Sequence, residues 1–332
     1  MIDFNLLDEI IAQNNSFILT THVNPDADAI GSEIAFYKIL KHFGKKVRIV
    51  NHSSTPYNLT FLDSDNVIEK FDYEMHSELF KNADVIVLID LNNFSRTVSI
   101  NESISNSNAK KICIDHHQLP DNKADFYFLD TELAATGEII LDFLMTKHKP
   151  LITNEIAIPL YAAIMTDTGS FRFERTTPKL HRDVAYLIEK GVNPVEIYDK
   201  IYDQSKFSKI KLLGRTLNTI QLLHNDKLAI MTITQNDFIE TQAEESDTEN
   251  FVNFNLSIEG VVLGLLFIEL KNGFKVSFRS KGNVRADLLA NQFGGGGHKN
   301  AAGARFYNQE MNQETINQIL ENSIAYLKSI GE

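Results

Sequence analysis

The stretch SFILTTHVNPDADAIGSEIAFYKIL (residues 16–40) contains the change from strand to helix that decides the fold. Its apolar start predicts a short buried strand, and from Ala29 onward apolar residues recur at the spacing of one helix face. The loop between these two elements carries one imidazole and two carboxylates, those of His22, Asp26 and Asp28. Like charges this close together repel, so a positive group is needed to offset them.

The same alternation of buried strand and helix continues through the first half of the chain. Apolar runs predict further strands at 46–51, 83–90 and 109–115, and helical patterns follow at 136–146 and 154–165. Buried strands that alternate with helices are typical of an α/β fold whose sheet is mainly parallel and flanked by helices.

The order of the elements changes in the last third of the chain. Two apolar runs flank the turn residues Asn272 and Gly273, which predicts a β-hairpin in a smaller α+β domain. An amphipathic, mostly helical stretch precedes that domain. We therefore expect a first domain over 1–193, a helical linker over 194–225 and a second domain over 226–332.

The composition is that of an ordinary globular protein, with 332 residues, 43% of them hydrophobic. The formal net charge of −12 argues against unspecific adhesion to long nucleic acid, which needs a positive surface. The single cysteine, Cys113, cannot form a disulfide within the chain, which fits a reducing compartment. The N-terminus lacks the basic flank of a signal peptide, and no apolar run is long enough to span a membrane, so we expect a cytoplasmic protein.

Four places in the first half carry acids or histidines directly after an apolar element: THVNPDAD, LIDLNN, CIDHHQ and IMTDTGSF. Taken singly, each has a plain reading as a helix cap, a turn or a loop residue. In a parallel sheet, however, the carboxyl ends of the strands share one edge, and ligands bind there. We therefore expect one cluster at that edge, formed by His22, Asp26, Asp28, Asp90, Asp115, His116, His117 and Asp167.

The charges of this expected cluster favour two divalent cations. Four carboxylates carry four negative charges, which two such ions balance; these acids are Asp26, Asp28, Asp90 and Asp167. Mixed carboxylate and imidazole ligands suit Mn²⁺ best, with Mg²⁺, Co²⁺ or Fe²⁺ as alternatives. Two neighbouring ions activate a bridging water and stabilise the attacking and leaving oxygens in phosphoryl transfer.

The four motifs resemble those of the DHH phosphoesterases. The segment VSFRSKGNVRADLLANQFGGGGHKNAAGARF (276–306) resembles their DHH-associated C-terminal domain, and the likeness covers nearly the whole chain. The chain is similar to the two-domain bacterial nanoRNases that also dephosphorylate pAp (3′-phosphoadenosine 5′-phosphate). This resemblance implies a catalytic two-metal domain followed by a substrate-binding domain.

The resemblance also implies a role for each residue of the cluster. One metal would be held by His22, Asp26 and Asp90. The second would be held by Asp28, Asp90, His116 and Asp167, with Asp90 bridging the two ions. His117 would contact the substrate phosphate as a catalytic residue, and Asp115 would fix a histidine tautomer.

The second domain contains a local basic segment and a glycine-rich loop. Between Arg279 and Arg305 five basic residues face a single acid. The sequence GGGGH lets backbone N–H groups approach an anion, and a helix directly after it would add a favourable dipole. By resemblance, the nucleotide or its phosphate would be bound by Arg279, Ser280, Gly295, Gly296, Gly297 and His298.

These observations predict a metal-dependent hydrolase of phosphoester bonds. It would cleave short RNA oligonucleotides to mononucleotides as an exoribonuclease and pAp to AMP as a bisphosphate nucleotidase, without holding long nucleic acid in a stable complex. Alternatives are a phosphodiesterase for cyclic or linear dinucleotides (c-di-AMP, pApA or pGpG), a RecJ-like single-strand DNA exonuclease, and a binding protein that senses a nucleotide. The sequence leaves open the preferred substrate, the cleavage polarity, a homodimer, and the roles of Arg96 and Arg172.

Overall fold

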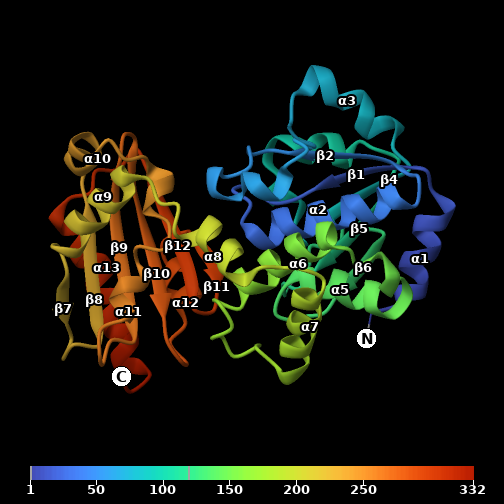
Figure 1. The fold of residues 1–332 in the computed structure, drawn as a ribbon. Helices are drawn as coiled ribbons and strands as arrows, with labels where there is room; N and C mark the ends of the chain where they lie inside the picture. The colour runs from blue at the N-terminus through green and yellow to red at the C-terminus, as the bar shows by residue number, and fades with distance from the viewer. Residues whose placement is uncertain (1, 119) are drawn as a thin grey trace. The chain divides into compact units, whose positions relative to one another are not determined.

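The computed structural model describes residues 2–118 and 120–332, which form two compact units (Figure 1). The first unit ends at Gln204 and the second runs from Ser205 to Glu332. The stretch 194–225, which the sequence predicts as a linker, contains one helix of the first unit and a helix and a short strand of the second. Each unit has a six-stranded sheet of its own.

The sheet of the first unit is parallel throughout, as the sequence predicts. Its strand order is β3-β2-β1-β4-β5-β6. The strands are β1 (Ser16–Thr20), β2 (Lys46–Asn51), β3 (Ile68–Lys70), β4 (Val85–Ile89), β5 (Lys110–Asp115) and β6 (Phe126–Leu129). The sequence analysis did not predict the two edge strands, β3 and β6, because both are short and only partly buried.

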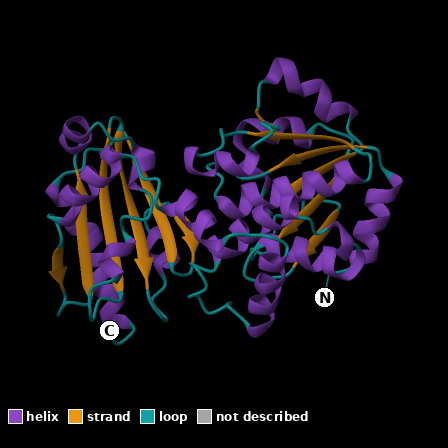
Figure 2. Ribbon diagram, viewed as in Figure 1, coloured by secondary structure: helices purple, strands orange, loops and turns teal. Residues whose placement is uncertain are grey.

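Helices cover both faces of this sheet (Figure 2). The α-helices are α1 (Phe4–Gln13), α2 (Ala27–His42), α3 (Tyr73–Asn82), α4 (Asn101–Ser105), α5 (Thr136–Lys147), α6 (Asn154–Asp167), α7 (Pro178–Glu189) and α8 (Pro194–Tyr202). Three 3₁₀ helices join them: η1 (Tyr57–Asp63), η2 (Phe94–Ile100) and η3 (Lys149–Leu151). The helices predicted at 136–146 and 154–165 are confirmed as α5 and α6.

The core lies on both sides of the sheet because successive strand residues point to opposite faces. Ile89 packs into the larger cluster with α2, α5 and α6, whereas its neighbour Leu88 packs into a smaller cluster on the other face. The helices α2 and α6 approach closely at Gly31, where an added Cβ would lie 2.3 Å from the Pro159 carbonyl oxygen. This close packing brings the two helix ends that carry Asp28 and Asp167 to the same edge of the sheet.

The second unit contains a mixed sheet in the order β11-β12-β10-β9-β8-β7, in which β8 and β9 are parallel and the other neighbours antiparallel. Its strands are β7 (Gln221–Leu223), β8 (Leu228–Ile233), β9 (Leu263–Leu270), β10 (Gly273–Ser280), β11 (Gly296–His298) and β12 (Ala301–Tyr307). Its helices are α9 (Phe207–Leu217), α10 (Gln235–Thr241), η4 (Glu245–Thr248), α11 (Asn253–Leu256), α12 (Ala286–Asn291) and α13 (Gln313–Ser329). The predicted hairpin is confirmed as β9 and β10.

The glycine-rich segment differs from the prediction in one respect. Gly296, Gly297 and His298 form the strand β11, which pairs with β12, so that a strand and not a helix follows the glycines. The expected helix dipole is therefore wrong. The reason is that the next residues, from Ala301 onward, continue into the sheet and satisfy their backbone groups there. Among the described residues, no helix has the length and apolar character needed to cross a bilayer.

Candidate metal centre

Acids and histidines from four chain segments meet at the carboxyl edge of the first sheet. Loops after β1 and β4 supply His22 and Asp90, and β5 ends in Asp115, which His116 and His117 follow. Asp26 caps the N-terminus of α2 by accepting a hydrogen bond of 3.1 Å from the backbone N–H of Ala29, and Asp28 lies in the first turn of the same helix. Asp167 is the last residue of α6.

The first group of potential ligands consists of His22, Asp26 and Asp90, whose nearest ligand atoms all lie within 4.8 Å of one another. Nε2 of His22 lies 3.3 Å from Oδ2 of Asp90 and 4.0 Å from Oδ2 of Asp26. The other ring nitrogen, Nδ1, lies 2.9 Å from the carbonyl oxygen of Val23. That contact favours the tautomer with the proton on Nδ1, which leaves the lone pair of Nε2 facing the two carboxylates.

The second group consists of Asp28, His116 and Asp167, again within 4.8 Å. Nε2 of His116 lies 3.2 Å from Oδ2 of Asp167 and 3.8 Å from Oδ2 of Asp28. It also lies 3.6 Å from Oδ1 of Asp90, the carboxylate that faces His22 with its other oxygen. Asp90 thus lies between the two groups and contributes one oxygen to each.

A third contact links Asp115 to the second histidine of the pair. Oδ1 of Asp115 lies 2.6 Å from Nδ1 of His117 and accepts a hydrogen bond of 2.8 Å from the backbone N–H of His116. Burial would raise the pKa of Asp115, but the hydrogen bond with His117 and the charges of His117 and His116 together outweigh it and hold that pKa below the usual range. Asp115 is therefore a fixed, charged acceptor for His117.

The N-terminus of α5 supports the buried carboxylates of Asp28 and Asp90. The sequence analysis did not predict this support. The backbone N–H groups of Thr136 and Gly137 donate to the Asp28 carboxylate at 2.7 and 2.9 Å. The hydroxyl of Thr136 donates to Oδ1 of Asp90 at 2.9 Å, and that of Ser32 donates to Oδ1 of Asp28 at 3.2 Å. Backbone donors carry no sequence signature; the one available signal was a threonine and a glycine at the start of a predicted helix.

The shifted pKa values in this cluster indicate that its carboxylates lack a positive counter-charge. Burial, together with the neighbouring acids Asp28 and Asp26, raises the pKa of Asp90 well above its usual range. Burial and Asp28 raise the pKa of Asp167 to about 7. Burial alone would lower the pKa of His116, but Asp167 and Asp28 raise it to about 9. A positive charge among these groups relieves the repulsion that these shifts express.

The donor set fits divalent cations. Both ring nitrogens of His116 and Oδ2 of Asp115 are buried, and within the described residues they form no hydrogen bond. The separations of 3.2–4.0 Å between imidazole and carboxylate atoms are longer than good hydrogen bonds. They match the spacing of about 3–4 Å between ligand atoms that each lie ~2.1 Å from one ion.

The predicted nucleotide-binding residues of the second unit lie near one end of its sheet. Arg279 and His298 are both in register with Ala301, on opposite sides of β12. Burial lowers the pKa of Arg279, and among the described carboxylates none forms an ion pair with its guanidinium. Ser280 is already engaged: its hydroxyl donates to the Val284 carbonyl at 2.6 Å.

The glycines and the other basic residues of this segment differ in how closely the surrounding chain contacts them. Gly295 and Gly297 lie against β12, where an added Cβ would meet the backbone oxygens of Gly303 at 2.2 Å and of Ala301 at 2.4 Å respectively. The neighbour Gly296 has no such contact closer than 3.7 Å. Two of the basic residues form ion pairs, Arg285 with Asp287 and Arg305 with Glu245, which also pairs with Lys275. Arg279 is thus the cation of this segment that is both largely buried and without an ion-pair partner in the described part of the chain.

Known proteins are similar to this chain in sequence and in architecture. The DHH family N-terminal domain matches residues 16–164, and the DHHA1 domain matches residues 225–329. The bifunctional oligoribonuclease and PAP phosphatase NrnA of Thermus thermophilus is 32% identical over 89% of this chain and 85% of its own length. The protein of the same name from Bacillus subtilis is 28% identical over 90% of this chain and 91% of its own length.

A solved structure extends the likeness to three dimensions. An exopolyphosphatase-related protein from Bacteroides fragilis superposes with a TM-score of 0.93 at 27% identity, covering 98% of this chain and 96% of that one. The family expected from the four sequence motifs is thereby confirmed. The chain belongs to the DHH family, with a DHH domain followed by a DHHA1 domain.

Proposed function

We propose that this chain is a divalent-metal-dependent phosphoester hydrolase that cleaves short RNA oligonucleotides to mononucleotides and pAp to AMP. The observation that carries the proposal is Asp90, which lies between two groups of ligands and faces His22 with one oxygen and His116 with the other. The Thermus and Bacillus relatives, both named as oligoribonuclease and PAP phosphatase, support the choice of substrates.

In this proposal the cluster holds two cations. His22, Asp26 and Asp90 would bind one of them, and Asp28, Asp90, His116 and Asp167 the other. Mn²⁺ suits this mixture of carboxylate and imidazole ligands best. When bound, such ions lower the pKa of water and stabilise negative charge on phosphoryl oxygens.

The chain's own residues would orient the ligands and the substrate. Thr136 and Gly137 hold the Asp28 carboxylate in place by backbone hydrogen bonds of 2.7 and 2.9 Å, so that it does not rotate away from the cluster. Asp115 holds Nδ1 of His117 at 2.6 Å. Nε2 is then the nitrogen with which His117 would contact the substrate phosphate or supply a proton to the leaving oxygen.

The second unit would bind the nucleotide. Arg279 is the strongest candidate there, because its guanidinium suits phosphate oxygens and forms no ion pair within the described residues; it donates one hydrogen bond of 3.0 Å, to the Phe278 carbonyl. An added Cβ would meet no backbone atom within 4 Å at Gly294 or Gly296, so an anion could approach the backbone of the glycine segment on that side. Ser280 would act indirectly, by shaping the turn that follows Arg279.

The test is hydrolysis by the purified protein with Mn²⁺, using labelled RNA of two to five nucleotides, RNA of about 24 nucleotides, and pAp. We expect mononucleotides from the short RNA, AMP from pAp, and little product from the long RNA. A chelator should abolish both activities, and added Mn²⁺ should restore them. A preference for the 24-mer, or turnover that survives the chelator, would contradict the proposal.

A further inference from the structure

Buried polar groups line up across three neighbouring strand ends of the first sheet, those of β2, β1 and β4. Asn51 is the last residue of β2, Thr21 directly follows β1, and Ile89 is the last residue of β4. The parallel pairing of these strands places Thr21 between the other two. The next residues along the chain after Thr21 and Ile89 are His22 and Asp90, two candidate ligands of the first metal.

Thr21 is hydrogen-bonded on both sides. Its backbone N–H donates to Oδ1 of Asn51 at 3.2 Å, and its hydroxyl donates to the carbonyl oxygen of Ile89 at 2.7 Å. That carbonyl belongs to the peptide group that leads into Asp90, and the N–H of the same peptide donates to the Ile114 carbonyl at 3.0 Å. Asp90 has a φ of 59°, in the left-handed region that a residue with a Cβ disfavours. Both sides of this peptide are therefore held where the backbone would not settle unaided.

Glu33 of α2 selects the amide orientation that lets Asn51 accept from Thr21. Nδ2 of Asn51 donates to Oε2 of Glu33 at 2.7 Å, which turns Oδ1 toward the N–H of Thr21. A flipped amide would set its NH₂ group against that N–H, so that two buried donors would face each other without an acceptor. All three residues are buried, with at most 1% of each exposed.

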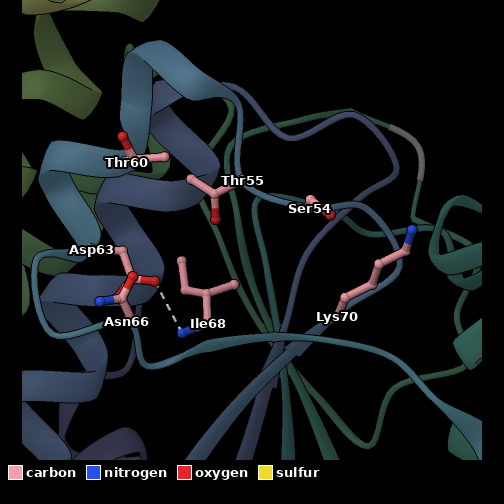
Figure 3. A pocket seen from close by; sticks show the side chains of 7 residues that line it. All are labelled: Ser54, Thr55, Thr60, Asp63, Asn66, Ile68 and Lys70. Carbon is pink, nitrogen blue, oxygen red and sulfur yellow. Dashed lines mark hydrogen bonds between the residues drawn. The ribbon is translucent and has the colours of Figure 1, made fainter.

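The nearby acid Asp63 does not compete for this contact. Its carboxylate accepts from the backbone N–H groups of Val67 at 2.8 Å and Ile68 at 3.1 Å, and Figure 3 marks the second of these hydrogen bonds. Burial raises the pKa of Glu33 to about 8; the hydrogen bond from Asn51 opposes this shift and the charge of Asp63 adds to it. In the described part of the chain, Oε1 of Glu33 has no hydrogen-bond partner, so its side chain acts on its surroundings through Asn51.

We propose that Glu33, Asn51 and Thr21, here called the buried row, position the candidate ligands of the first metal. The row fixes the residue before His22 and the peptide that leads into Asp90, whose Nε2 and Oδ2 atoms lie 3.3 Å apart. The inference rests on the proposed function and adds to it three positioning residues that are not metal ligands. Groups that orient a metal ligand typically change metal affinity by about 10- to 100-fold.

The first test measures the dissociation constant of Mn²⁺ by isothermal titration calorimetry on full-length proteins. Thr21→Val removes the hydroxyl that holds the Ile89 carbonyl and keeps the side-chain shape. We expect its dissociation constant to rise about tenfold or more. The matched control is Thr216→Val, which removes a buried hydroxyl that donates to the Leu212 carbonyl at 2.8 Å in the second unit. The control should lower the Tm to a similar extent and leave Mn²⁺ binding at the wild-type value.

The second test compares two uncharged replacements of Glu33. Glu33→Leu leaves the Asn51 amide free to rotate, and we expect the dissociation constant of Mn²⁺ to rise about tenfold. Glu33→Gln keeps an oxygen that accepts from Asn51, so it should restore most of the affinity. Since neither variant carries a carboxyl group, a difference between them cannot come from charge. Equal affinities in the two variants would overturn the role of Glu33.

The outcomes separate this inference from the proposed function. If Thr21→Val binds Mn²⁺ as tightly as the wild type while its Tm falls as in Thr216→Val, the row is only structural, the inference is refuted and the proposed function stands. If Thr21→Val does not fold, the two Glu33 variants decide the question. If the wild type neither binds Mn²⁺ nor hydrolyses short RNA or pAp, the proposed function fails and the inference fails with it.

Discussion

The backbone N–H of Gly137 donates a hydrogen bond of 2.9 Å to Oδ1 of Asp28, a residue 109 positions earlier in the chain. This contact joins the first turn of α2 to the N-terminus of α5, and it orients a carboxylate that is completely buried. The partial positive charge of a helix N-terminus stabilises an anion in that position. Much of the candidate metal centre therefore depends on how these helices pack.

Replacing Gly137 by alanine tests that dependence. An added Cβ would lie 2.6 Å from the Cβ of Ala163, so α5 and α6 must separate and the support of Asp28 must shift. We expect a loss of stability of about 1–3 kcal/mol, seen as a lower Tm, and a weaker stabilisation by Mn²⁺ in thermal unfolding. Gly214→Ala is the control, since nothing lies within 4 Å of the added methyl group in α9 and its Tm should not fall.

Asp90→Asn should separate stability from activity. Burial and neighbouring acids make the charged form of Asp90 unfavourable without metal, so a neutral amide of the same shape relieves repulsion. We expect the metal-free variant to have an equal or higher Tm, no rise in Tm with Mn²⁺, and hydrolysis reduced at least a thousandfold.

The exposed Asp203, at the end of α8, provides the control for the same chemical change. Asp203→Asn should keep both the Mn²⁺-dependent rise in Tm and the activity. Full activity in the Asp90→Asn variant would show that a bridging carboxylate is not needed, contrary to the proposed mechanism.

Asp115→Asn should impair the reaction without preventing metal binding. The amide can no longer act as a charged acceptor for Nδ1 of His117, so the orientation and basicity of that ring change. We expect kcat to fall by about 10- to 100-fold while the Mn²⁺-induced rise in Tm persists. The combination with His117→Ala should lower kcat no further than His117→Ala alone; additive losses would mean that the two residues act separately.

The buried carboxyl of Glu33 should make the folded protein less stable as the pH rises from 5 to 8. It is buried, its Oε2 accepts a hydrogen bond of 2.7 Å from Asn51, and burial raises its pKa to about 8. Since the folded carboxyl holds its proton more tightly than the ordinary value of 4.5, its contribution to stability is complete below about pH 4.5 and is lost as the pH rises toward 8.

The comparison with Glu33→Gln measures this effect, because glutamine keeps the shape and does not ionise. The Tm of the wild type relative to that of the variant should fall between pH 5 and pH 8, by an amount equivalent to at most ~5 kcal/mol. Parallel Tm profiles for the two proteins across this range would show that Glu33 is not protonated in the folded state.

A structural feature can be predicted from the sequence when it depends on residues that are close together in the chain. The strand at 16–20, the helix after it and the hairpin around Asn272 follow from periodicity and turn residues, which act over a few positions. The parallel sheet follows from the repetition of strand and helix. The edge strands β3 and β6 were not predicted, because they are too short to carry a pattern and are stabilised by pairing with the preceding strands β2 and β5, which local periodicity does not show.

By itself, the sequence determined the fold class, the family and the residue types that gather at the sheet edge, because each strand end and each charged motif consists of residues that are neighbours in the chain. Only the tertiary structure decided that Asp90 lies between two ligand groups, that α5 supports Asp28 through backbone N–H groups, and that the end of the glycine segment pairs as a strand. These features depend on atoms brought together from distant positions. The distances between these atoms are set by how the helices and strands pack, and no local sequence pattern encodes that packing.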